Sequence, residues 1–125
     1  MTLQELYEDI GGSYDSVKRI LPMDKLIEKF ILKFPEDKSF EKLSEAWKGR
    51  DGQGMFDGAH MMKGVCANLG LDRLSAAASE IAEEFRPGNA RRLNDAELDR
   101  RMEELTALYE RTVSGIRGYS TEKAT

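Results

Sequence analysis

Apolar side chains recur every three to four residues along almost the whole chain, the spacing that gives an α-helix one apolar face. No segment alternates apolar and polar residues as a half-buried strand would. A helical chain is therefore predicted. The longer helices are expected over residues 22–34, 38–48, 53–69, 71–86 and 94–118.

Two shorter helices are predicted at the N-terminus. Thr2 and Glu5 have the spacing of a capping box, and the helix that they open stops at Gly11–Gly12. A second short helix follows over residues 13–20. At the other end of the chain, the polar segment 119–125 is expected to be a disordered tail.

The number of helices and their short connections decide the fold class. Four amphipathic helices joined by short loops favour an antiparallel up-down four-helix bundle. The expectation is an all-α fold of one domain over residues 1–118, with the short N-terminal helices as additions. The pattern does not decide which four of the longer helices form the central bundle.

The only histidine in the chain, His60, lies inside the predicted helix 53–69. At about 100° per residue, the core side of this helix carries Met55, Met62, Val65, Cys66 and Leu69. The opposite side carries His60, Lys63, Gly64 and Ala67, with Phe56 and Gln53 beside them. His60 is therefore predicted to point away from the core.

Small residues accompany the histidine on this outer side. An exposed helix face would ordinarily carry long polar side chains, but Gly64 and Ala67 leave room for another molecule to approach closely. Phe56 adds apolar surface one turn before His60, and apolar surface of this kind favours docking. The predicted docking surface consists of Gly64, Ala67, Phe56 and Gln53.

The residue types on this face also indicate a reaction. An exposed imidazole is largely uncharged at neutral pH, so a ring nitrogen can act as a nucleophile. Lys63 follows His60 by three residues, on the same face, where its ammonium group can stabilise a phosphoryl group on the ring. The alternative is a purely structural bundle whose surface histidine has no function.

Composition and charge exclude several classes of function. The net charge is −4 and the basic residues are interspersed with acidic ones, which argues against a nucleic-acid partner. No run approaches the ~20 apolar residues that span a bilayer, and no secretory leader is recognised. A single cysteine fits a reducing compartment. A cytoplasmic monomer without membrane contact is expected.

Two further motifs are better explained without a ligand. The segment 49–58 resembles a nucleotide-binding loop through Gly52, Gly54 and Gly58, but no strand precedes it and no Gly-Lys-Ser/Thr follows. Asp57 and His60 have a spacing that metal ligands use, but no other ligands accompany them. Neither a metal nor a resident cofactor is therefore expected.

The remaining conspicuous residues are interpreted as structural. Trp47, Phe30, Phe34 and Cys66 are assigned to the core. The arginine pairs 91–92 and 100–101 are interpreted as solvated charges rather than a binding patch.

The sequence around the histidine resembles a known family. His-x-x-Lys-Gly followed by Leu-Gly and a spaced leucine is similar to the histidine-containing phosphotransfer (HPt) domain of two-component phosphorelays. The matching residues, with Ala59 before the histidine also typical, are His60, Lys63, Gly64, Leu69, Gly70 and Leu74. The resemblance implies a four-helix bundle that carries phosphate.

The family implies a role for each of these residues. His60 would accept a phosphoryl group from a receiver-domain aspartate and pass it to another receiver, Lys63 would stabilise it, and Gly64 would permit close docking. The partners implied are response-regulator receiver domains and a hybrid histidine kinase, with Mg²⁺ on the partner receiver. Such a protein is a phosphocarrier without an ATP site, which leaves open whether it is called an enzyme.

One position departs from the family pattern. Relatives often carry Gln or Glu in the following helix, in the neighbourhood where this chain has Ala82, so the polar side chain typical of the family is not expected at position 82. Glu83, Glu84 and Arg86 are the alternative candidates for contact with the partner. A helical adaptor, or pseudo-HPt, that docks receiver domains without phosphotransfer is the leading alternative function.

Overall fold

The computed structural model describes residues 1–124, and every regular element in this part of the chain is helical. The elements in order are α1 (Leu3–Asp9), α2 (Tyr14–Ile20), α3 (Asp24–Lys33), the 3₁₀ turn η1 (Phe34–Glu36), α4 (Ser39–Lys48), α5 (Gly52–Asn68), α6 (Asp72–Phe85) and α7 (Asp95–Ala124). The predicted helices lie close to these bounds, except that α7 extends to residue 124 rather than ending near residue 118. The all-α prediction is confirmed.

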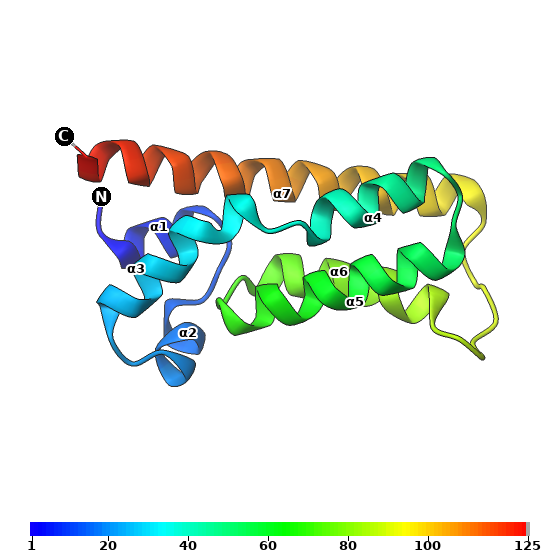
Figure 1. Ribbon diagram of the computed structural model, residues 1–125, viewed down its shortest axis with the longest axis horizontal. Coiled ribbons are helices and arrows are strands. Elements are labelled where there is room, and N and C mark those ends of the chain that lie inside the picture. The colour runs from blue at the N-terminus through cyan, green and yellow to red at the C-terminus, as the bar shows by residue number, and fades with distance from the viewer. Residues whose placement is uncertain (125) are drawn as a thin grey trace.

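Helices α4 to α7 form the bundle, which agrees with the predicted fold class. Figure 1 shows α7 along the whole length of the molecule, with α4 beside its N-terminal half and α5 and α6 next to each other. Across the α4–α7 contact, the rings of Phe40 and Tyr109 stack with their centroids 4.0 Å apart. The core includes the fully buried side chains of Leu43, Met62 and Met102.

The N-terminal helices hold the C-terminal end of α5 in place through hydrogen bonds. Tyr7 is fully buried, and its hydroxyl donates a hydrogen bond of 2.6 Å to the backbone carbonyl of Leu69. The backbone N–H of Ser13 donates to the carbonyl of Gly70 at 2.8 Å. Gly70 has a φ of +70°, a left-handed conformation that glycine adopts without strain, and it ends the helix that carries the histidine.

The expected disordered tail is replaced by helix. Helix α7 continues through residues 119–124, whereas residue 125 lies outside the described residues. Tyr119 is buried, and its hydroxyl donates to the Glu28 carboxylate on α3 at 3.0 Å. Lys123 forms an ion pair with the same carboxylate at 3.6 Å. Contacts with α3 therefore order a segment that the local sequence predicts to be mobile.

The core assignments are mostly confirmed, with one error. Phe34 is buried, and Trp47 is half-buried with its indole N–H donating to Asp99 at 2.7 Å. Cys66 is fully buried, and burial raises the pKa of its thiol to about 12, so it is a core residue. Phe30, however, is 41% exposed and is not part of the core.

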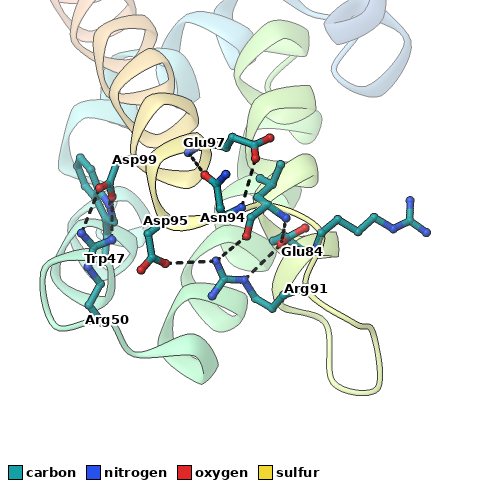
Figure 2. A network of polar contacts seen from close by, with 10 residues as sticks. Trp47, Arg50, Glu84, Arg91, Asn94, Asp95, Glu97 and Asp99 are labelled. Atoms are coloured by element: carbon teal, nitrogen blue, oxygen red, sulfur yellow. Dashed lines mark hydrogen bonds and ion pairs between the residues drawn. The ribbon is translucent and has the colours of Figure 1, made fainter.

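A polar network closes the end of the bundle near the α6–α7 loop (Figure 2). Arg50 pairs with Asp99 at 2.7 Å, next to the Trp47 bond. Arg91 pairs with the buried Glu84 carboxylate at 3.3 Å, while its own side chain remains exposed, as predicted for a solvated charge. Asn94 caps α7 by accepting a hydrogen bond of 2.8 Å from the backbone N–H of Glu97.

Candidate functional site

Helix α5 presents the histidine on its outer side, as its helical phase predicts. The side chains of Met55, Met62 and Cys66 are buried, whereas His60 is exposed. Of the other residues predicted on the outer side, Gly64, Ala67 and Gln53 are exposed, and Lys63 and Phe56 are half-buried. Val65, which was expected in the core stripe, is also half-buried at its edge. The outer side of α5 is thus one continuous face, made by Gln53, Phe56, His60, Lys63, Gly64 and Ala67.

Two glycines of α5 have opposite surroundings. A Cβ atom added at Gly58 would lie 2.8 Å from the backbone of Leu43, so this glycine permits the close packing of α4 on α5. A Cβ added at Gly64 would meet nothing within 4 Å. Gly64 therefore serves no packing contact within residues 1–124, and its missing side chain leaves open surface next to the histidine.

The imidazole of His60 lies against an aromatic ring. The rings of Phe56 and His60 are stacked, with centroids 5.4 Å apart and planes inclined by 17°. The Arg86 guanidinium lies over the Phe56 ring, 5.3 Å from its centroid. Arg86 in turn donates to the Glu83 carboxylate at 2.8 Å. Residues of α5 and α6 are thus joined around the histidine.

The ammonium group of Lys63 is available at this site. Among residues 1–124, Lys63 forms no ion pair, although it is half-buried. Its backbone carbonyl accepts a hydrogen bond of 3.1 Å from the Ser75 hydroxyl on α6. An ammonium group that is not held in an ion pair can pair with an added phosphoryl group.

Helix α6 has no polar side chain at position 82, but it carries the Glu83 carboxylate at the next position. Ala82 is 1% exposed and is covered in the helix interface, so it contributes packing only. Glu83 is exposed; hydrogen bonds from Arg86 lower the pKa of its carboxyl, and the charges of Lys63 and His60 act in the same direction. Glu83 is therefore ionised at neutral pH, and it lies within electrostatic reach of the histidine.

Glu84, the third candidate for partner contact, is turned inward. Its carboxylate accepts hydrogen bonds of 2.8 Å from the backbone N–H groups of Arg92 and Leu93, in addition to the Arg91 pair (Figure 2). Burial raises the pKa of this carboxyl, but the hydrogen bonds outweigh burial and the pKa is lower than usual. Glu84 therefore organises the α6–α7 loop and is not free for a partner.

An apolar groove that the sequence pattern does not predict lies beside the histidine-bearing helix. Its residues come from the end of α2, from α3 and η1, and from the end of α5; the apolar ones are Ile20, Leu21, Phe30, Phe34, Val65 and Leu69. Ile20 is 50% exposed. The helical period assigns Phe30 to an apolar stripe, and only the position of α2 and α5 decides that the ring stays exposed.

Neither a metal site nor a membrane span is found in the described part of the chain. Over residues 1–124, no three His, Cys, Asp or Glu side chains are grouped in a way that could hold a metal ion. The Asp57 carboxylate accepts a hydrogen bond of 2.9 Å from the Gln53 amide. No helix within residues 1–124 combines the length and apolar character needed to cross a bilayer.

Comparison with family models shows to which protein family the chain belongs. The family model described as Hpt domain matches residues 25–115, which include the whole of α4, α5 and α6. The chain belongs to the Hpt domain family. Hpt domains take part in histidine phosphotransfer in phosphorelays, where they interact with receiver domains. Searches of curated proteins and of solved structures gave no match. Helices α1 and α2 precede the matched region.

Proposed function

We propose that this protein is a phosphorelay phosphocarrier in which His60 accepts a phosphoryl group from a receiver-domain aspartate and transfers it to another receiver domain. The observation that carries the proposal is the exposed His60 on α5, followed by Lys63 and an open Gly64, within the region of the Hpt match. The His-x-x-Lys-Gly spacing is the feature by which the sequence resembles the family.

The proposed reaction is a transfer of one phosphoryl group between two proteins. The lone pair of an imidazole nitrogen, expected to be Nε2, forms the new N–P bond while the P–O bond to the donor aspartate breaks. The electron pair of that bond leaves with the aspartate, which becomes a free carboxylate. Lys63 pairs with the phosphoryl oxygens and neutralises part of their charge.

The chain itself needs few groups for this reaction because phosphoryl transfer depends mainly on positioning and charge neutralisation. The receiver domain is proposed to bring the acidic residues and the Mg²⁺ ion that they hold. No ATP site is required in this chain, which distinguishes a carrier from an autonomous kinase.

The docking face is proposed to begin at the exposed small residues of α5. Gly64 and Ala67 allow a partner helix or loop to approach closely, and Gln53 and Phe56 border the same face. The apolar groove is proposed to continue this face, because Val65 follows Gly64 directly and lines the groove. An apolar face of the receiver domain would cover it and bury Phe30.

The proposed partners are the receiver domains of response regulators and of a hybrid histidine kinase. The protein is proposed to act as a cytoplasmic monomer. A helical adaptor that docks receivers without accepting phosphate is the alternative, and it would need the same docking face but not the nucleophile.

A binding and transfer comparison separates these two functions. Purified protein and a His60→Gln variant are each mixed with a phosphorylated receiver domain, and complex formation and loss of receiver phosphate are measured. The phosphocarrier proposal predicts that both proteins bind and that only the wild type removes the phosphate. Binding without phosphate removal by the wild type would support the adaptor and refute the carrier.

A further inference from the structure

The stack between His60 and Phe56 has a consequence for the reactivity of the histidine. An exposed side chain ordinarily exchanges among staggered rotamers, so its ring plane is not fixed. Phe56 precedes His60 by four residues and lies on the same side of α5. Because the two ring planes are inclined by only 17° at a centroid distance of 5.4 Å, the imidazole stacks nearly parallel to the phenyl ring.

Contacts from the neighbouring helix hold Phe56 in place. The phenyl ring is half-buried, and the Arg86 guanidinium lies 5.3 Å from its centroid. Arg86 donates to Glu83 from Nε at 3.1 Å and from Nη2 at 2.8 Å. The Phe56 ring is therefore held by both α5 and α6, and it is more constrained than the exposed imidazole beside it.

We propose that Phe56 is a positioning residue for the phosphoacceptor, in addition to bordering the docking face. Stacking restricts the imidazole of His60 to a plane nearly parallel to the phenyl ring. An imidazole oriented before docking raises the fraction of encounters in which the nitrogen faces the phosphorus atom. The inference rests on the proposed function, since it assigns Phe56 a part in that same transfer.

The kinetic test compares variants of Phe56 with a matched control. Phe56→Leu and Phe56→Met keep apolar bulk but remove the aromatic plane, whereas Phe56→Tyr keeps it. Phe85 is the control site, because its ring is also half-buried and lies 4.8 Å from an arginine guanidinium, that of Arg91. Each variant receives phosphate from a phosphorylated receiver domain, and the maximal transfer rate and the half-saturating receiver concentration are measured.

The expected result is a selective change in the maximal rate. Phe56→Leu and Phe56→Met should lower it about 3- to 10-fold, because the imidazole then divides its time among several rotamers, with little change in half-saturation. Phe56→Tyr and Phe85→Leu should stay within about twofold of the wild type. A rise in half-saturation alone would make Phe56 a docking residue only and overturn the proposal, as would equal losses in Phe85→Leu.

Two further measurements separate failure of this inference from failure of the proposed function. Phosphoramidate, a small donor that needs no docking geometry, should label the wild type and the control variant Phe85→Leu at similar rates. If the wild type accepts phosphate from neither donor, the carrier function fails and the positioning role fails with it. Because His60 is the only histidine, its ring-proton NMR signals are unambiguous. They should move downfield in Phe56→Leu as ring-current shielding is lost, and unchanged signals would refute the stack.

Discussion

Replacing Gly64 by glutamine should stabilise the protein and impair its docking at the same time. The added Cβ meets nothing within 4 Å, so the folded protein accepts it without strain. Glutamine is a better helix former than glycine by about 0.5–1 kcal/mol, and this gain should appear in the free energy of unfolding. For a domain of this size, the midpoint of thermal unfolding should rise by about 2–4 °C.

The same side chain should obstruct the receiver domain. Forcing extra atoms into a closely packed contact costs about 1–3 kcal/mol, so the dissociation constant for the receiver should rise about 5- to 150-fold. Thermal unfolding by circular dichroism and receiver titration by calorimetry measure the two effects separately. Unchanged or tighter receiver binding would refute the close-approach argument, and a lower unfolding temperature would refute the open surface at Gly64.

Gly58→Ala is the matched control on the same helix. Its added Cβ would lie 2.8 Å from the Leu43 backbone, so α4 and α5 must move apart. Overpacking of this kind costs about 1–3 kcal/mol, which exceeds or offsets the gain of about 1 kcal/mol in helix propensity. The variant should therefore be less stable than Gly64→Gln, and receiver binding by the folded fraction should be retained.

Three other residues give further expectations. Lys63→Ala should lower the rate of phosphate acceptance from a receiver about tenfold, since a charge-assisted hydrogen bond contributes about 1.5 kcal/mol, and unchanged rates in a stopped-flow assay would remove its assigned role. Glu84→Gln should reduce the free energy of unfolding at neutral pH by about 1–3 kcal/mol in urea titrations. The pKa of Glu84 is lowered in the folded protein, so its carboxylate stabilises the fold above about pH 4.3, and this stabilisation is lost as the pH falls through the pKa of the folded state. The Glu84→Gln variant should therefore lose less stability in acid than the wild type. Identical acid profiles of the two proteins would contradict this. Phe30→Ser should weaken receiver binding with little loss of stability, as its ring is 41% exposed, and an unaltered dissociation constant would exclude the groove from the docking face.

The sequence was most informative where a local rule decides the structure. The exposure of His60 follows from the 100° step of a helix and the positions of Met55, Met62 and Cys66, so no tertiary information was needed. The capping box at Thr2 likewise depends on residues three positions apart, and it forms. The opening of the surface at Gly64 is consistent with the same phase argument.

The errors concern residues whose surroundings come from distant parts of the chain. Phe30 fits the apolar stripe of α3, but it stays exposed because the elements beside it form a groove rather than a covering layer. Tyr119 looks like part of a polar tail, yet α3 supplies the Glu28 carboxylate that binds it. Glu84 resembles its exposed neighbour Glu83 in sequence, and only the path of the α6–α7 loop buries it.

The central claim is that His60 carries the phosphoryl group, and chemical stability of the labelled protein tests it most directly. The protein is mixed with a receiver domain that carries labelled phosphate, separated from it, and treated with acid or with base, and the modified residue is located by mass spectrometry. A phosphohistidine at His60 should be lost in acid, survive in base, and be absent from a folded His60→Gln variant. Label that persists in His60→Gln, or a wild type that stays unlabelled while the receiver binds, would contradict the account.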